Sequence, residues 1–157
     1  MALVPYERVT LSEFRRVRAA RPGTVALAKE LRHRVEGNPG FDKNPALNGL
    51  FNHRMARGSL VTPSLHSGGR ALDLGIRLSP QGVQLGNFLT FALMAKAVPL
   101  GIQRIIWREH VYEAGKPPRK LRHKSDPTLN HDNHLHIELT NHAADKMNDA
   151  WVRGVLG

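Results

Sequence analysis

The chain has 157 residues, 41% of them hydrophobic, which suits a single folded domain with one hydrophobic core. It contains no cysteine, so disulfides, thiolate metal ligands and a cysteine nucleophile are excluded, and any metal must be bound by His, Asp or Glu. The formal net charge of +10 favours association with polyanions, whether nucleic acid or an anionic cell envelope, although a basic charge of this size also serves solubility alone.

Two helices are predicted in the N-terminal third of the chain. Residues 10–20 begin with a Thr or Ser cap and an early Glu and end with arginines, as a short helix does. After a break at residues 21–23, residues 24–36 carry four apolar residues on one helical face, Val25, Ala28, Leu31 and Val35. Residues 38–52 are rich in Gly, Pro and Asn and are expected to form a long loop.

A strand followed by a long helix is predicted in the middle of the chain. Residues 71–76 alternate, with Leu72, Leu74 and Ile76 on one face and Asp73 on the other. A turn at residues 80–82 leads to an apolar helix over residues 85–98, which is expected to be the central buried helix and to use Phe88 for core packing.

Strands dominate the prediction for the C-terminal part until a last helix. Residues 102–107 form a strand that residues 110–112 continue or pair with, and residues 114–130 form a cationic loop. Residues 134–139 form a strand whose period of two puts His134 and His136 on one face. Asn141 is expected to cap the last helix, whose buried stripe is Ala144, Met147, Trp151 and Val155.

Histidine and aspartate residues gather in two short stretches. His66 and Asp73 are seven positions apart with two glycines between them, and His131, His134 and His136 lie within six residues. Catalytic zinc needs three protein ligands of N or O type and an open fourth position. If the strands over residues 71–76 and 134–139 are neighbours in one sheet, these stretches supply such a set. The alternative is an incidental histidine-rich surface strand.

These motifs resemble those of a family of zinc peptidases. Ser64-x-His66-x-x-Gly69-x-x-x-Asp73, followed by His134-x-His136, is similar to the group of lysostaphin, D-alanyl-D-alanine metallopeptidases and hedgehog. The likeness is closer to penicillin-insensitive murein endopeptidases and to peptidase domains of actinobacterial proteins and phage lysins. The resemblance implies that His66, Asp73 and His136 bind zinc and that His131 and His134 are active-site residues. It also makes Arg54, Ser64 and Arg70 the candidate substrate-binding residues.

With the predicted elements, the resemblance implies an α+β fold. A small, mainly antiparallel sheet carries the zinc site and about four helices flank it, as in hedgehog and the D-alanyl-D-alanine peptidases. The whole chain, residues 1–157, is expected to form one domain, with the helices of residues 1–37 as an extension packed on it.

One position departs from the family pattern. Relatives carry Asp or Glu three residues before the last zinc ligand, as general base, whereas this chain has Asn133, with Asp132 one place earlier. An amide cannot take a proton from water. Either His134 or Asp132 then acts as the base, or the protein is slow or only binds. Glu138 lies on the face of His136, where it either orients that imidazole or is a plain surface residue.

The function implied is a zinc-dependent metallopeptidase that cleaves peptide bonds of bacterial peptidoglycan. No apolar run reaches the ~20 residues that span a bilayer, and the start lacks a signal peptide. A monomer that stays in the cytoplasm until lysis or accessory export brings it to the cell wall is therefore expected. One alternative is a non-catalytic, zinc-containing module that binds the wall. Another is a metal-dependent nuclease, suggested by the charge and the run from His131 to His134, although other nuclease elements are missing. The bond cut, and endo- versus carboxypeptidase action, stay open.

Overall fold

The computed structural model describes residues 3–56, 59 and 61–157. The helices of these residues are α1 (Leu11–Arg16), α2 (Pro22–Val35), α3 (Pro80–Ala95), α4 (Ala97–Leu100), α5 (Asn141–Lys146) and α6 (Asp149–Leu156). Two short 3-10 helices are η1 (Pro45–Leu47) and η2 (Leu65–Gly68). The strands are β1 (Ala71–Gly75), β2 (Ile102–Trp107), β3 (His110–Tyr112), β4 (Arg119–Lys120) and β5 (His134–Leu139).

The five strands form one antiparallel sheet in the order β1-β5-β2-β3-β4. Strands β1 and β5 are hydrogen-bonded neighbours although their nearest ends, Gly75 and His134, are 59 positions apart in sequence, and Asp73 lies opposite His136. The predicted α+β class with an antiparallel sheet is therefore confirmed.

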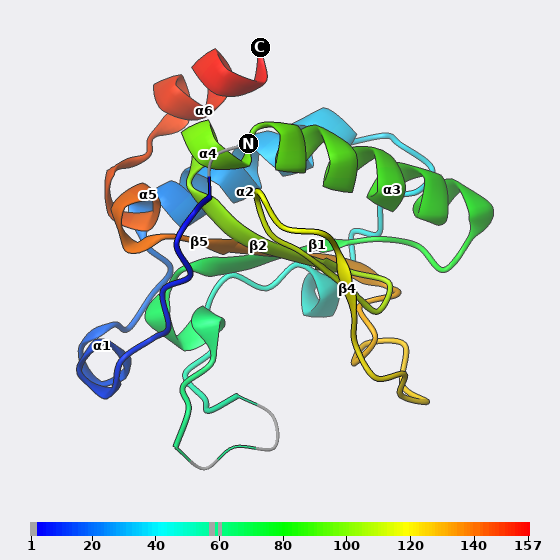
Figure 1. Ribbon diagram of the computed structural model, residues 1–157. Helices are drawn as coiled ribbons and strands as arrows, with labels where there is room; N and C mark the ends of the chain where they lie inside the picture. Colours follow the sequence, from blue (N-terminus) through cyan, green and yellow to red (C-terminus); the bar gives the residue numbers. More distant parts are fainter. Residues whose placement is uncertain (1–2, 57–58, 60) are drawn as a thin grey trace.

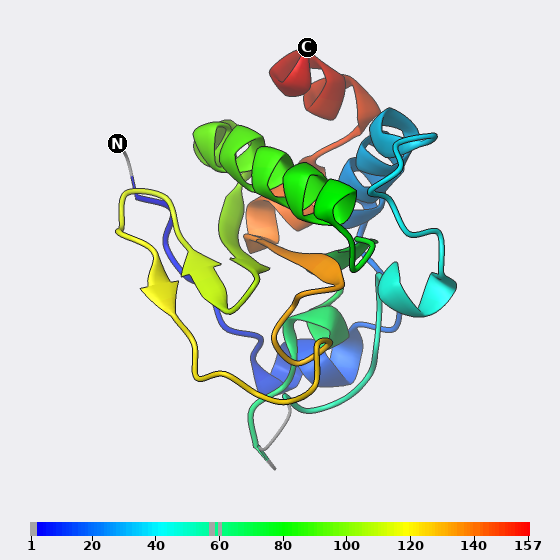
Figure 2. The ribbon, with the colours of Figure 1, turned by 90° about the vertical axis from the view of Figure 1, so that its right-hand side faces the viewer.

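The two faces of the sheet are covered by different elements. Helices α2, α3, α4 and α6 lie on one side of it, and α1 with η2 lie on the other (Figures 1 and 2). The apolar side chains of β1 and β5 are fully buried under the helices, and they are Leu72, Leu74, Leu135, Ile137 and Leu139. Because side chains alternate along a strand, Asp73, His134 and His136 must lie on the opposite face.

The N-terminal segment is tied to the rest of the domain by buried charges. The guanidinium of Arg70, at the start of β1, bonds Glu13 of α1 with Nε 3.0 Å from Oε2, and Arg21 Nη2 lies 2.8 Å from the same oxygen. Arg70 Nη1 also donates to the carbonyls of Glu7 and Leu139. The segment expected to be an extension thus packs against the strands.

Six α-helices lie within the described residues, where about four were expected, because two predicted helices are each divided. The helix of residues 85–98 is interrupted at Lys96, whose ψ of 12° leaves the helical region. The last helix is interrupted at Met147, whose ψ of 139° is extended, and Asn148 caps a new helix. Thr140, not Asn141, caps the first of these two pieces.

Prolines begin two of the helices earlier than predicted. Pro22 and Pro80 occupy the first turns of α2 and α3, where the missing N–H costs no hydrogen bond. The break expected at residues 21–23 lies instead at residues 17–21, and the predicted turn at 80–82 is wrong because these residues form the first turn of α3. The prediction for Phe88 is also wrong, because α3 packs with one face only and the Phe88 side chain is 68% exposed.

Two smaller features complete the fold. The cationic loop of residues 114–130 contains β4, which pairs with β3. In the part of the chain that the structure describes, no helix is both long and apolar enough to cross a membrane.

Candidate metal centre

The backbone brings three donor side chains to one point of the sheet face. Asp73 and His136 come from paired positions of β1 and β5. His66 comes from η2, which Ser64 caps by accepting a hydrogen bond from Ser67 N. Gly69 then ends η2 with a left-handed φ of 68°, and a Cβ there would lie 2.5 Å from Ala19 O, so the turn into β1 requires glycine.

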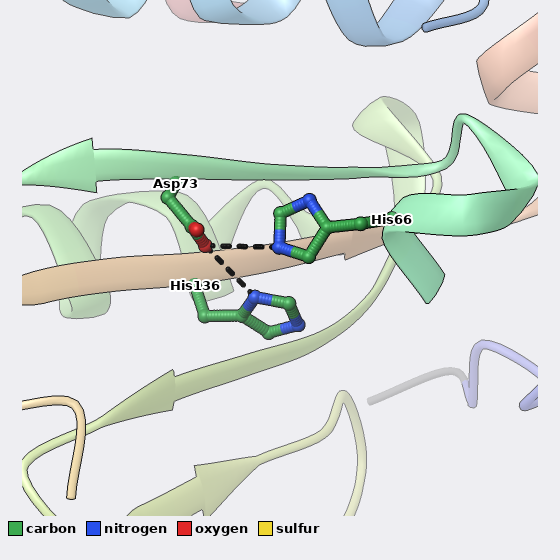
Figure 3. A group of neighbouring side chains, drawn as sticks. All are labelled: His66, Asp73 and His136. Atoms are coloured by element: carbon green, nitrogen blue, oxygen red, sulfur yellow. Dashed lines mark hydrogen bonds and ion pairs between the residues drawn. The ribbon is translucent and has the colours of Figure 1, made fainter. Parts of the chain in front are cut away.

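Asp73 lies at the centre of the three side chains (Figure 3). Its Oδ1 is 3.2 Å from His66 Nε2 and 2.9 Å from His136 Nδ1. One ligand atom from each residue lies within 4.8 Å of the other two. Two imidazole nitrogens and one carboxylate oxygen, all on one face and mostly buried, are the donor types that zinc prefers. The residues present therefore fit a divalent metal.

The protonation of Asp73 and His136 is set by their mutual contact. Burial would raise the pKa of Asp73, but the hydrogen bonds from His136 and His66 hold it far below the ordinary range, so Asp73 is a carboxylate. Burial would lower the pKa of His136, but hydrogen bonds to Asp73 and Glu138 raise it to about 9. Without metal, His136 is thus an imidazolium that donates from both nitrogens.

Glu138 contacts the far side of the His136 ring. Its Oε1 is 3.1 Å from His136 Nε2, and its side chain is almost entirely buried. Burial would raise the pKa of this carboxyl, but the hydrogen bond from His136 lowers it below its ordinary value. The alternative of a solvent-exposed strand residue is wrong, because β5 is buried on both faces here.

His134 and His131 stand beside the three donors. His134 Nε2 is 3.9 Å from Asp73 Oδ1, and the His131 ring centroid is 4.7 Å from that of His134. Burial lowers the pKa of His134 to about 4, and burial together with the neighbouring His136 and His134 lowers that of His131 to about 3. Both rings are neutral at pH 7 and each has a nitrogen able to accept a proton.

Asn133 orients the His134 ring. Its Nδ2 donates to Thr128 Oγ1 at 3.0 Å, so its Oδ1, 2.8 Å from His134 Nδ1, accepts from that nitrogen. The proton of His134 is then on Nδ1, and the lone pair of Nε2 is on the side of Asp73. Asn133 therefore has a positional role in this chain.

Asp132 does not join the cluster. It is half-buried and lines a surface cavity of about 850 Å³ together with Trp107 and Arg108. Within the described residues its carboxylate makes no ion pair with any histidine. The structure thus favours His134 over Asp132 as the group nearest the candidate metal ligands.

The three candidate substrate-binding residues differ in accessibility. Arg70 is fully buried and its guanidinium is occupied by Glu13 and two carbonyls, an environment typical of a structural residue, so substrate contact by Arg70 stays a prediction. Ser64 is also buried, and its hydroxyl caps η2, so its contact with substrate stays a prediction too. Arg54 is half-buried, donates to Met55 O, and lies on the segment whose backbone pairs with Ser64. Arg54 is the most accessible of the three.

Residues behind the site were missed from the sequence. Gln103 and Arg104 of β2 surround the Glu138 carboxylate, with Arg104 Nε 3.9 Å from Oε2. Strand alternation could have placed Arg104 on this face, because it is two residues from Ile106 and opposite Glu138. Gln103 reaches the same carboxylate because the register shifts between Ile102 and Arg104, which no sequence signal announces.

Comparison with known proteins gives one family relationship. No curated protein and no solved structure matches the chain. Residues 44–135 match the model of the family described as VldE, C-terminal domain. The matched segment contains β1, β2, β3 and β4, the residues His66 and Asp73, and the first two residues of β5. Since it spans more than half of the 157 residues, the chain belongs to the VldE C-terminal domain family.

Proposed function

We propose that this protein is a zinc-dependent metallopeptidase that cleaves peptide bonds of bacterial peptidoglycan. The observation that carries the proposal is the convergence of His66 Nε2, Asp73 Oδ1 and His136 Nδ1 within 4.8 Å of one another, from segments far apart in sequence. The proposal is supported because the three residues that converge are the same three that the resemblance to the lysostaphin, D-alanyl-D-alanine metallopeptidase and hedgehog group implies as zinc ligands. His66, Asp73 and His136 would hold the metal.

The chain's own residues then divide the chemistry. Bound zinc supplies a lowered water pKa, toward ~7, and polarisation of a carbonyl. His134 accepts the proton of the attacking water at Nε2, because Asn133 keeps its other nitrogen protonated. The same ring then donates that proton to the leaving amine. His131 lies against His134 and provides a second neutral imidazole beside it for the proton transfer.

Substrate contact falls to surface residues around this face. Arg54 is positioned by the backbone pairing beside η2 and offers a cation to a stem-peptide carboxylate. The net charge of +10 favours binding to an anionic cell wall. We infer a monomer that acts at the wall and takes peptidoglycan peptide, not nucleic acid, as its partner.

The test uses purified sacculi incubated with the zinc-loaded protein, followed by mass analysis of released fragments and counting of new amino groups. We expect new peptide termini, and we expect chelator to abolish them and added zinc to restore them. The variant His134→Ala should keep one zinc per chain but lose hydrolysis by ~10²–10⁴-fold. A control, His33→Ala, changes an exposed histidine of α2 and should behave as wild type. No new termini at stoichiometric protein would overturn the proposal.

A second candidate is a zinc-containing module that binds the wall without cutting it. The observation that favours it is Asn133, which stands where the zinc peptidases that the motifs resemble carry an acidic base. In that case the protein would sediment with sacculi, zinc would be present, and no new termini would form. The sacculus experiment therefore separates the two candidates directly.

A further inference from the structure

Glu138 is held in a fixed position behind the candidate metal ligand His136. It follows His136 by two residues on the same face of β5, and it is 4% exposed. Its two carboxylate oxygens face different groups. Oε1 is 3.1 Å from His136 Nε2, while Oε2 faces away from the ring toward β2.

The second oxygen is held by side chains from β2. Gln103 Nε2 is 3.5 Å and Arg104 Nε is 3.9 Å from Glu138 Oε2. Arg104 is itself fixed, because its guanidinium bonds Glu113 Oε1 at 2.8 and 3.1 Å. The carboxylate therefore cannot rotate away from His136 without losing these contacts.

The N-terminal segment immobilises the same two β2 residues. The Gln103 amide exchanges two hydrogen bonds with the backbone of Glu7, both 3.1 Å long. Arg104 donates to the Tyr6 hydroxyl at 3.2 Å and lies 4.0 Å over the Tyr6 ring. A chain of contacts thus runs from residues 6 and 7, outside the family-matched segment, through β2 and Glu138 to His136.

We propose that Glu138 is a positioning residue that sets the metal affinity of the site by fixing the ring of His136. By accepting a hydrogen bond from Nε2–H, it leaves Nδ1 as the nitrogen that faces Asp73 and His66. Since an imidazole has two nitrogens, this choice decides which one can bind a metal. The inference rests on the proposed metal site at His66, Asp73 and His136.

The test measures zinc affinity by competition with a chromophoric chelator for wild type, Glu138→Ala and Glu138→Gln. Loss of an outer hydrogen-bond partner of a metal ligand typically weakens metal binding ~10–100-fold, which is the result expected for Glu138→Ala. Glu138→Gln should lose less, because its oxygen still accepts from Nε2–H while its NH₂ meets the donors Gln103 and Arg104. The matched control Glu36→Gln changes an exposed glutamate and should bind zinc as wild type.

A second readout separates positioning from folding. In zinc-loaded wild type and Glu138→Gln, ¹⁵N NMR of the His136 ring should show the proton on Nε2, and Glu138→Ala should lose that single state. If Glu138→Ala does not fold, Glu138→Gln decides, since its affinity must still fall below wild type. A folded Glu138→Ala that binds zinc within twofold of wild type overturns the inference. A wild type that binds no zinc instead overturns the metal site itself.

Discussion

Replacing Arg70 by alanine tests whether this residue supports the fold or binds substrate. Its guanidinium is completely buried and makes four contacts of 3.0–3.4 Å, two to Glu13 and two to the carbonyls of Glu7 and Leu139. Removing it leaves a buried carboxylate with one cation fewer and two carbonyls without this donor. A residue with these contacts should affect stability and leave the chemistry of the folded protein unchanged.

The size of the effect follows from these contacts. Removing one partner of a buried ion pair destabilises by ~3–5 kcal/mol. Arg21 Nη2 remains 2.8 Å from Glu13 Oε2 and still neutralises the carboxylate, so we expect the lower end, about 3 kcal/mol. For a chain of this length 1 kcal/mol shifts the melting temperature by ~2–4 °C, so Arg70→Ala should melt roughly 6–12 °C below wild type.

Thermal melts followed by circular dichroism measure this, with zinc content and sacculus hydrolysis recorded on the same samples below the melting range. The matched control is Arg54→Ala, which removes a half-buried arginine whose guanidinium donates to Met55 O within the described residues, and which should change stability by less than ~0.5 kcal/mol. In sacculus hydrolysis we expect the opposite ranking of the two variants: Arg54→Ala raises KM, whereas folded Arg70→Ala does not. A stable Arg70→Ala protein with a raised KM would refute the structural reading of Arg70.

Three further predictions concern packing and protonation. Gly86→Ala should destabilise by ~1–3 kcal/mol in urea unfolding, because a Cβ there would lie 2.2 Å from the Trp107 ring; unchanged stability would contradict the close approach of α3 to β2. Phe88→Ser should stay within ~0.5 kcal/mol of wild type while Leu89→Ala, at a buried neighbour, loses ~2–5 kcal/mol. Chelated protein should lose on the order of 1–3 kcal/mol as pH rises from 6.5 to 9.5. The pKa of His136 is raised to about 9, so its protonated form stabilises the fold fully below the unfolded pKa of ~6.5, and this stabilisation is lost as pH rises through the folded pKa. His136→Gln should lack this loss, and a flat wild-type profile would exclude the ion pair with Asp73.

Local patterns predicted the strands that carry the site. The alternation in residues 71–76 and 134–139 put Asp73 opposite to the aliphatic residues and put His134 with His136, and both arrangements are found. Helix ends were predicted less well, because proline and asparagine are each compatible with two different positions relative to a helix. A proline breaks a helix in its middle but begins one at its first turn, as Pro80 does in α3.

Sequence patterns misplaced residues whose environment comes from distant segments. Arg70 and Ser64 look like surface polar residues beside a motif, but Arg70 is buried by Glu13, which is 57 residues away. Phe88 is hydrophobic, as core residues are, yet the helix that carries it covers the sheet with its other face. Burial depends on which element packs where, and hydrophobicity alone does not say so.

The sequence by itself determined the donor set: no cysteine, a histidine and an aspartate seven residues apart, and two histidines on one strand face. These follow from residue chemistry and from the period of a strand, which are local properties. Only the tertiary structure decided that Asp73 meets His136, that His136 turns Nδ1 toward Asp73, and that Glu138 holds it there. The pairing of two strands and the contacts of buried charges join segments across the whole chain, and no local pattern encodes them.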